Sequence, residues 1–377
     1  MHVLIVSAGY PTTYDSKKSI FHQMQAEALV KNGCKVGVIA VVPVALREVL
    51  QKKRLKFGWL RKTNHGVISS VYQYLSLPKM RAKWMSHPLK KGKDEFEKYV
   101  SLHGVPEVVH LHSFQAGYLG IWIKEKYGVK LVVTEHSSRF ITNAWSSELL
   151  DHAKAIFREC DYRIAVSPLF VEILSKLSGV PFHYLPNCVD TDFFQPEPLE
   201  SQSEWFSFIC VASFTANKNQ TLIATSFLQT FTLNEKVRVV FYGAGEERTK
   251  VKNLFEDAGR SQQAVFVKDA SREQLREWIG KSQVLLSASK VETFGITLIE
   301  AMSMGLPVIA TRSGGPQAIV TDARLGFLVN EAQYGLKMKE MMENHASFDP
   351  VFIRKHAVEN YSSHIVAQRL REVYQKL

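Results

Sequence analysis

The sequence predicts an α/β protein made of two doubly wound domains. Its 377 residues exceed one average domain and suit two. Apolar runs such as His2–Ser7 and Val284–Ser287 are short and nearly continuous, as in parallel strands that are covered on both faces. Each of these two runs is followed by a loop and then by apolar residues at helical spacing, which is the order of a parallel crossover unit.

The composition is that of a globular protein with sizeable cores. Hydrophobic residues make up 46% of the chain and aromatic residues 11%. The four cysteines are not spaced as metal ligands or redox pairs, so we expect reduced, buried thiols in a cytoplasmic protein. We expect no signal peptide, because no basic segment precedes the first apolar run, and no membrane span, because no apolar run approaches about 18 residues.

The N-terminal half begins as a doubly wound sheet. The strand His2–Ser7 leads through a long loop to an amphipathic helix over Ile20–Lys31, and a second strand follows at Val36–Val41. Ligands bind at the carboxyl ends of such strands, so the loop 8–19 is a candidate binding segment. No GxGxxG follows the first strand, which argues against binding of a nicotinamide dinucleotide.

The alternation of strands and helices continues in both halves. A strand at Lys130–Thr134 places His136 just beyond its carboxyl end. The polar segment 196–203 contains proline and is typical of an interdomain link. Further strands are expected at Val105–His112, Tyr162–Val166, Phe206–Ala212, Val237–Tyr242, Val265–Val267, Val308–Ala310 and Gly326–Val329, and helices at Leu119–Lys126, Ala153–Cys160, Arg272–Gly280 and Phe352–Leu377.

The stretch 282–311, SQVLLSASKVETFGITLIEAMSMGLPVIAT, is the most informative chemically. Val284–Ser287 is expected to be a buried strand, and apolar side chains from Ile296 onward form one face of a helix. Gly295 opens this helix, so free backbone N–H groups and the positive end of the helix dipole face the preceding loop. Such a terminus suits a diphosphate, and glycine lets the ligand approach the backbone closely.

Two glutamates flank this anion site. Glu292 precedes the helix, and Glu300 lies about two turns into it. Phosphate groups would repel both carboxylates, but the carboxylates can accept hydrogen bonds from hydroxyl groups on either side of a diphosphate. A nucleotide sugar has such hydroxyls on its hexose and on its ribose.

The pattern Glu292-x7-Glu300, with Phe294-Gly295 between the glutamates, resembles the signature of family-4 retaining glycosyltransferases of the GT-B fold. The resemblance implies two Rossmann-like domains with an interdomain cleft. Residues 1–190 would bind the acceptor and residues 191–365 the nucleotide sugar, while a C-terminal helix at 366–377 would pack back on the first domain. It also implies that Glu292 faces the donor sugar, that Glu300 binds the ribose, and that the backbone of Phe294, Gly295 and Ile296 contacts sugar and phosphate.

The same resemblance assigns roles to three further residues. His136 would lie beside the donor sugar, near the reacting carbon. Ser213–Asn219 matches the donor-phosphate loop of the family, in which Lys218 keeps the usual lysine whereas Ser213 replaces the usual arginine. A hydroxyl cannot replace the forked guanidinium, so stabilisation of the leaving group is expected to depend on Lys218 and on the helix that begins at Gly295.

Other positions of this sequence either match or depart from the pattern of the resembled family. The turns at 243–246 and 311–316 match family loops, and we expect the first to be structural and the second to lie near the donor. Ser19 and Cys188 stand where the family usually has glycine. If the glycine at 188 is needed for a positive φ, the cysteine should cost stability.

Histidines raise the question of a metal. His110 and His112 end the strand Val105–His112, and we expect both to be structural. A site made of His110, His112 and His136 lacks an acidic or cysteine partner to complete it. Transfer in the resembled family does not depend on a bound divalent metal, so we expect no metal and no other cofactor.

The net charge of +11 lies in the first half of the chain. Residues 1–190 have 26 basic and 15 acidic side chains, and residues 191–377 have 21 of each. Residues 44–99 alone have 14 basic and 4 acidic side chains, interleaved with aromatic residues. This pattern suits peripheral binding to an anionic membrane surface, such as the inner face of the plasma membrane, or a solvated basic face over buried aromatics. No recognition motif supports binding of nucleic acid.

We therefore predict a retaining hexosyltransferase that moves a hexose from a nucleotide diphosphate sugar to a hydroxyl of a glycan or glycolipid acceptor, lipid-linked or part of a cell-surface polysaccharide. His136, Lys218 and Glu292 would act by positioning and charge stabilisation. A GT-B nucleotide-sugar epimerase would instead convert the donor without an acceptor, and a non-catalytic sugar-nucleotide binding protein would bind the donor without turnover. The sequence does not identify the nucleotide, the hexose or the acceptor.

Overall fold

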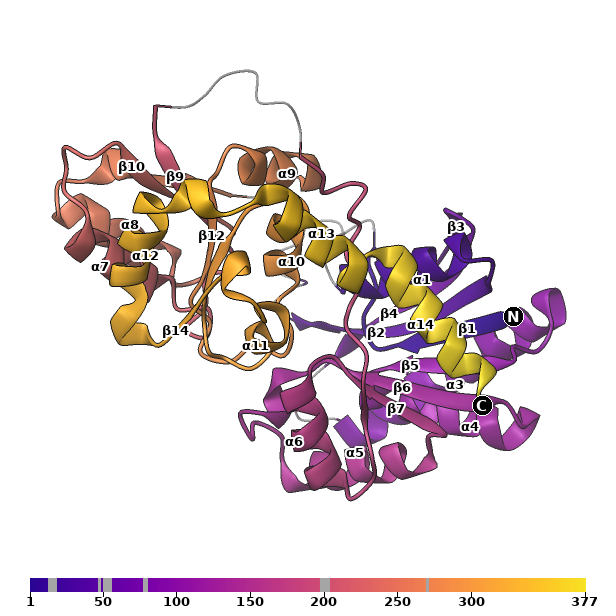
Figure 1. Cartoon of the computed structure of the whole chain (residues 1–377). Coiled ribbons are helices and arrows are strands. Elements are labelled where there is room, and N and C mark those ends of the chain that lie inside the picture. Colours follow the sequence, from indigo (N-terminus) through magenta and orange to yellow (C-terminus); the bar gives the residue numbers. More distant parts are fainter. Residues whose placement is uncertain (13–18, 47–48, 50–55, 77–80, 197–203, 269–270) are drawn as a thin grey trace. The chain divides into compact units, whose positions relative to one another are not determined.

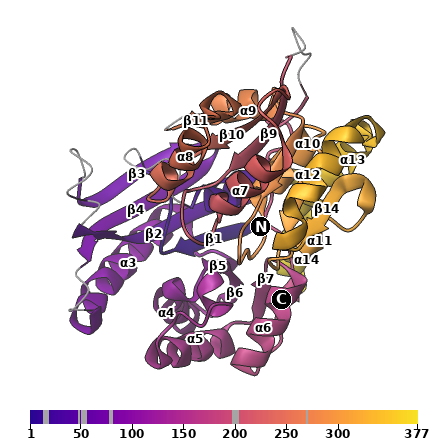
Figure 2. The same ribbon diagram turned by 90° about the vertical axis from the view of Figure 1, so that its left-hand side faces the viewer.

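The computed structural model describes residues 1–12, 19–46, 49, 56–76, 81–196, 204–268 and 271–377, with side chains of the helix that starts at residue 81 described from Pro88 onward. The chain divides into two compact units (Figure 1). Unit 1 comprises Met1–Cys188 together with Ser363–Leu377, and unit 2 comprises Val189–Ser362. Both units are α/β, with a sheet covered by helices on both faces, as the sequence predicts (Figures 1 and 2).

Unit 1 contains a sheet in the order β3-β4-β2-β1-β5-β6-β7-β8. Of the described strand pairs in this sheet, only β3 and β4 run antiparallel. The strands are β1 His2–Ser7, β2 Lys35–Ala45, β3 Gly58–Asn64, β4 Val67–Ser76, β5 Val108–His112, β6 Lys130–Glu135, β7 Tyr162–Ala165 and β8 His183–Tyr184. The helices are α1 Ile20–Lys31, α3 Arg81–His103, α4 Gly117–Tyr127, α5 Ser147–Glu159, α6 Pro168–Ser178 and α14 Ser363–Gln375.

The segment between β2 and β5 is more regular than the sequence suggests. The hairpin β3–β4 and the long helix α3 occupy most of the stretch that has no clear sequence periodicity. Its two turn residues, His65 and Gly66, both have positive φ, as a tight hairpin requires. His-Gly is not among the usual turn pairs, which explains why no hairpin is predicted here from the sequence.

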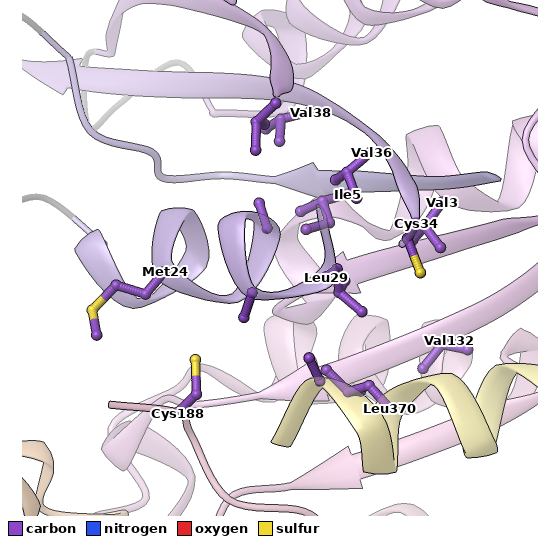
Figure 3. Packing of buried hydrophobic residues seen from close by; sticks show 14 of the residues in the cluster. Val3, Ile5, Met24, Leu29, Cys34, Val36, Val38, Val132, Cys188 and Leu370 are labelled. Atoms are coloured by element: carbon purple, nitrogen blue, oxygen red, sulfur yellow. The ribbon is translucent and has the colours of Figure 1, made fainter. Parts of the chain in front are cut away.

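The C-terminal helix α14 belongs to the core of unit 1. Figure 3 shows Leu370 of α14 near Val132 of β6, and Leu29 of α1 and Val3 and Ile5 of β1 belong to the same buried cluster. Val366 and Tyr374 of α14 are buried in the same cluster. The final segment of the chain therefore completes the cover of the first sheet.

Unit 2 contains a sheet in the order β11-β10-β9-β12-β13-β14, and all of its described strand pairs run parallel. Its strands are β9 Phe206–Val211, β10 Val237–Tyr242, β11 Ala264–Val267, β12 Val284–Ser287, β13 Val308–Thr311 and β14 Gly326–Val329. Its helices are α7 Gln220–Thr230, α8 Arg248–Asp257, α9 Arg272–Gly280, α10 Ile296–Ser303, α11 Pro316–Ile319, α12 Tyr334–Glu343 and α13 Pro350–Tyr361.

In each sheet the strand order reverses beside one central strand. This switch lies between β1 and β5 in unit 1, and between β9 and β12 in unit 2. Ligands of doubly wound sheets bind outside the carboxyl ends of the strands at such a point. The loops that follow these four strands are therefore where a functional site is expected.

The two positions where the resembled family usually has glycine, Cys188 and Ser19, differ in backbone conformation. Cys188 is buried and does not have a positive φ, so the cysteine imposes no left-handed strain there. Ser19 has a φ of 53°, in the left-handed region that favours glycine. All four cysteines, Cys34, Cys160, Cys188 and Cys210, are described and buried, and none of them is in a disulfide. Among the described residues, no helix is both long enough and apolar enough to cross a bilayer.

Candidate functional site

The loops after β9 and β12 are joined side by side at the switch point of unit 2. Asn217 bridges them: its side-chain amide donates to the carbonyl of Val291 at 2.9 Å, and its Oδ1 accepts from the Val291 N–H at 3.1 Å. The N–H of Lys290 also donates to the Asn217 carbonyl at 2.8 Å. These bonds give the loop containing Lys218 and the loop containing Glu292 a fixed relative position.

Lys218 and Glu292 form an ion pair in this arrangement, although they are 74 residues apart in the sequence. Both side chains are partly accessible, with exposed fractions of 30% for Lys218 and 19% for Glu292. The hydroxyl of Ser289 lies 3.5 Å from the same glutamate oxygen. An ammonium and a carboxylate are therefore held together at the carboxyl ends of β9 and β12, open to a ligand.

The helix α10 begins beside this pair. Its cap Gly295 has a φ of 118° and a ψ of 56°, a conformation that side chains rarely adopt. The N–H of Leu298 donates to the Gly295 carbonyl at 3.1 Å, but the N–H groups of Ile296 and Thr297 have no acceptor among the described residues. Two unpaired amides at the positive end of a helix can bind an anion.

A glycine turn fixes the backbone in front of α10. The Glu292 N–H donates to the Ser313 carbonyl at 2.9 Å, and the Gly315 N–H donates to the Glu292 carbonyl at 2.7 Å. A Cβ at position 315 would lie 2.1 Å from the carbonyl oxygen of Phe294, so only glycine fits here. The turn at 311–316 therefore supports Glu292 and Phe294 from behind.

Glu300, in the second turn of α10, lies in a different environment from Glu292. Its side chain is buried, with an exposed fraction of 8% for the residue. Burial raises the pKa of Glu300 to about 7, and the guanidinium of Arg272 opposes this rise only in part. Burial, with the nearby charges of Glu273 and Glu300, also raises the pKa of Tyr242 to about 12. Arg272 and Tyr242 thus lie near Glu300 and extend the site, and neither is predicted from the sequence as a site residue.

Ser213 and Phe294, which are also predicted to bind the donor sugar nucleotide, have different surroundings. Ser213 is exposed, and its backbone carbonyl accepts a 3.1 Å hydrogen bond from the side-chain amide of Gln220. The turn at 243–246 holds this segment through a 2.9 Å bond from the Phe214 N–H to the Ala244 carbonyl, which supports a structural role for that turn. Phe294 buries its ring against Tyr361, with centroids 5.9 Å apart, so only its backbone can face a ligand.

In unit 1, the carboxyl ends of β1, β5 and β6 bring histidines together. Ser7 of β1 pairs in register with His112 of β5, and His112 pairs with Thr134 of β6, two residues before His136. His22 of α1 packs on this edge, with its ring centroid 4.2 Å from that of His112 and 5.4 Å from that of His136. His112 Nδ1 and His136 Nε2 lie 3.0 Å apart. The sequence pattern around His22 does not predict its place beside these rings.

Burial keeps these rings neutral. It lowers the pKa of His22 to about 4 and lowers the pKa of His112 and of His136 well below the ordinary value, and neighbouring histidines add to the effect in the latter two. His110 is also buried, but the Tyr374 hydroxyl lies 2.6 Å from its Nδ1 and the Thr134 hydroxyl 2.7 Å from its Nε2. Both ring nitrogens of His110 are therefore satisfied, in agreement with a structural role.

A second buried group at this edge is Glu135. Its carboxyl group accepts three backbone N–H bonds, from His136 at 2.8 Å, from Ser137 at 3.0 Å and from Phe114 at 3.1 Å. Burial raises the pKa of Glu135, and these three bonds oppose the rise. Glu135 thus fixes the backbone of the loop that presents His136.

Two family models together match nearly the whole chain. Glycosyltransferase Family 4 matches residues 23–193, and Glycosyl transferases group 1 matches residues 192–347. The chain belongs to the family-4 glycosyltransferases. The second match contains the complete pattern from Lys218 to Gly315 that surrounds the terminus of α10.

Curated relatives of this glycosyltransferase are distant. The gpi3 subunit of the phosphatidylinositol N-acetylglucosaminyltransferase from Schizosaccharomyces pombe is 25% identical over 55% of the chain and 47% of its own length. A D-inositol 3-phosphate glycosyltransferase from an Arthrobacter species is 24% identical over 60% of the chain and 59% of its own length. The chain thus spans about half the length of these relatives.

Solved glycosyltransferase structures share the whole fold. A sucrose-phosphate synthase from Thermosynechococcus elongatus aligns over 100% of this chain and 98% of its own, with a TM-score of 0.77 and 18% identity. The Anabaena protein HepE in complex with UDP aligns over 100% of both chains, with a TM-score of 0.75 and 16% identity. The GT-B fold predicted from the sequence is therefore confirmed.

The buried state of Glu300 predicts a pH dependence. Its carboxyl has a higher pKa in the folded protein, so its stabilising contribution is complete below pH 4.5 and is lost as the pH rises through about 7. A rise from 4.5 to about 7 corresponds to roughly 3 kcal/mol. Denaturant unfolding of wild type and Glu300→Gln should therefore show wild type losing about this much free energy of unfolding relative to the variant between about pH 4.5 and 8. A constant difference would contradict the buried, neutral carboxyl.

Proposed function

We propose that the chain is a retaining hexosyltransferase that moves a hexose from a nucleotide diphosphate sugar to an acceptor hydroxyl. One observation supports this above the others. In unit 2, two unpaired amides at the start of α10 lie between a partly open carboxylate, Glu292, and a buried one, Glu300. An anion site between two acceptors of hydroxyl hydrogen bonds matches the chemistry of a nucleotide sugar.

The ion pair suggests how the donor is received. A diphosphate would compete with Glu292 for the Lys218 ammonium, since both are anionic oxygen acceptors. The displaced Glu292 carboxylate would then accept hydrogen bonds from hydroxyls of the hexose. Lys218 and the amides of Ile296 and Thr297 would stabilise the negative charge that develops on the departing diphosphate. Lys218 and these two amides would compensate for the guanidinium that Ser213 does not provide. No metal ion is therefore proposed at the departing diphosphate.

His136 is the proposed partner of the transferring sugar from unit 1. Its ring lies at the carboxyl edge of the sheet, with Nε2 3.0 Å from His112 Nδ1, so the imidazole would have to exchange this partner before it donates to a sugar hydroxyl. No covalent nucleophile enters the proposal. Retention would follow from attack on the same face from which the diphosphate departs, with the enzyme contributing position and charge stabilisation.

The acceptor proposed is a hydroxyl of a lipid-linked glycan or glycolipid. The curated relatives include enzymes named for phosphatidylinositol and for inositol 3-phosphate. In the basic segment 44–99, Leu46 and Phe57 are exposed, each with an exposed fraction of 49%. In the sequence they flank the basic cluster Lys52-Lys53-Arg54, which lies outside the described residues. Apolar side chains beside basic ones suit the headgroup region of an anionic membrane.

Part of the basic segment is not free to bind lipid. Arg61 donates to the buried Glu95 carboxylate at 2.5 and 2.6 Å, and its guanidinium lies 5.3 Å from the ring centroid of Trp59. Trp59 in turn packs on Tyr72. This portion agrees with the alternative of a basic face over partly buried aromatics, so the proposed membrane contact is limited to the segment 46–57, whose described ends Leu46 and Phe57 are exposed.

Glu292→Gln should lower kcat more than roughly 100-fold while thermal unfolding stays near that of wild type. The amide keeps the shape but loses the charge and half of the acceptor capacity. Turnover is measured as transfer from a nucleotide sugar to an acceptor extract, and Glu277→Gln on the exposed face of α9 is the matched control. Wild-type activity in Glu292→Gln would contradict its role. Donor conversion without acceptor would favour the epimerase, and donor binding without turnover the non-catalytic protein.

Replacing Lys52, Lys53 and Arg54 by glutamine should reduce binding to vesicles that contain phosphatidylserine. Each basic side chain near such a surface contributes roughly 1 kcal/mol. Co-sedimentation measures the bound fraction, and replacing the exposed Lys250, Lys252 and Lys355 of unit 2 is the control for net charge. Equal loss in both triple variants, or no loss in either, would contradict a membrane contact at 46–57.

A further inference from the structure

The ring of His136 lies against two residues of α1 that have no part in the proposed transfer. Phe21 and His22 stand near the start of this helix. The ring centroid of Phe21 lies 4.8 Å from that of His136, and the ring centroid of His22 lies 5.4 Å from it. The two α1 rings also meet edge to face, with centroids 4.3 Å apart. The His136 ring is therefore packed on a pair of rings that one helix supplies.

This packing differs in kind from the hydrogen bond that His136 makes. Among the described residues, the His136 ring is hydrogen-bonded through Nε2, which lies 3.0 Å from His112 Nδ1, and its Nδ1 has no partner. In the proposed transfer, the bond to His112 is exchanged for one to a sugar hydroxyl. A ring contact has no donor or acceptor to exchange, so the packing of Phe21 and His22 can persist while the hydrogen bond changes.

His22 is itself fixed by the end of β1. Its Nδ1 lies 2.8 Å from the Gly9 carbonyl oxygen and 2.9 Å from the Ser7 hydroxyl oxygen. A carbonyl oxygen can only accept, so Nδ1 carries the proton and donates. The Ser7 hydroxyl in turn donates to the same carbonyl at 2.6 Å. His22 is only 5% exposed, and burial lowers its pKa to about 4, so the ring stays neutral in this one tautomer near neutral pH.

His22 also packs on the hydrogen-bond partner of His136. Its ring centroid lies 4.2 Å from that of His112. The centroids of His112 and His136 lie 5.3 Å apart, with an interplanar angle of 11°. One fixed ring is thus in contact both with the residue that would donate to the sugar and with the residue that it has to leave. A displacement of the His22 ring would disturb both.

We propose that His22, together with Phe21, positions His136 for the transfer. The inference rests on the proposed function, because these two residues act only through the role proposed for His136. The order of dependence is clear from the contacts: the backbone at the end of β1 fixes His22, and the rings of α1 fix the place in which the His136 ring can turn. Turnover is sensitive to such placement, since a shift of about 1 Å can lower it roughly 100-fold.

His22→Asn separates the anchor from the ring contact. The asparagine amide nitrogen takes the place of Nδ1 and can still donate to the Gly9 carbonyl, but the ring that packs on His136 is lost. The variant should lower kcat roughly 10- to 100-fold. The KM for the nucleotide sugar should stay unchanged, because the proposed donor contacts belong to unit 2. Wild-type kcat in folded His22→Asn would overturn the inference.

His183→Asn is the matched control. It makes the same substitution at a histidine of the same sheet that is also packed on a ring, since His183 of β8 stacks on Tyr162 with centroids 4.5 Å apart. This variant should keep the wild-type kcat. A loss of kcat equal to that of His22→Asn would show a general effect of removing a packed histidine and would overturn the inference.

A double-mutant cycle tests whether His22 acts through His136. His136→Ala should lower kcat by itself, and adding His22→Asn should cause little further loss, because the ring that His22 positions is already gone. The same factor of loss from His22→Asn in both backgrounds would show an independent effect and overturn the inference alone. A wild-type rate in His136→Ala would instead contradict the proposed function and overturn the inference with it.

Nuclear magnetic resonance of the chain with ¹⁵N-labelled histidine provides a measure without any substrate. His22 should be a neutral imidazole with its proton on Nδ1. The ring signals of His136 should shift or broaden in His22→Asn and stay in place in His183→Asn. Circular dichroism identifies a variant that does not fold, and Phe21→Leu, which removes the other ring contact of α1, then replaces it. A proton on Nε2 of His22, or unchanged His136 signals in the folded variant, would overturn the inference.

Discussion

The positive end of α10 is the constraint on which the proposed donor site depends. A helix that starts at a left-handed glycine leaves the amides of Ile296 and Thr297 unpaired at the carboxyl edge of a parallel sheet. The surrounding backbone is tied to this start by Asn217 on one side and by the glycine turn at 313–315 on the other. Groups fixed before the ligand arrives need little reorganisation when charge develops on it.

In the proposed function, the two glutamates would serve two ends of one ligand although they are the same residue type. Glu292 is partly open and is kept in place by an ammonium, so it can exchange its partner when a diphosphate arrives. Glu300 is buried, and its raised pKa keeps a large share of it protonated near neutral pH. A protonated carboxyl can donate as well as accept, which suits a pair of ribose hydroxyls. The difference comes from burial and not from the residue type.

Periodicity predicted the elements of unit 2 well, because its strands are short apolar runs bounded by polar turns. It failed between β2 and β5, where the hairpin turn His65-Gly66 has unusual chemistry and basic residues interrupt the apolar pattern. Periodicity does not single out Glu292, Lys218 and His136, whose proposed roles follow from the family resemblance. Their partners were not predictable from spacing: Lys218 meets Glu292 across 74 residues, and His22 reaches His112 only because α1 packs on the edge of the sheet.

A crystal structure of the chain with the UDP- or GDP-hexose that most raises its melting temperature tests the central claim most directly. The diphosphate should accept hydrogen bonds from the amides of Ile296 and Thr297 and from Lys218, with Glu292 turned to the hexose and Glu300 to the ribose. A diphosphate bound away from the start of α10, or a Lys218–Glu292 pair left intact beside it, would contradict the claim.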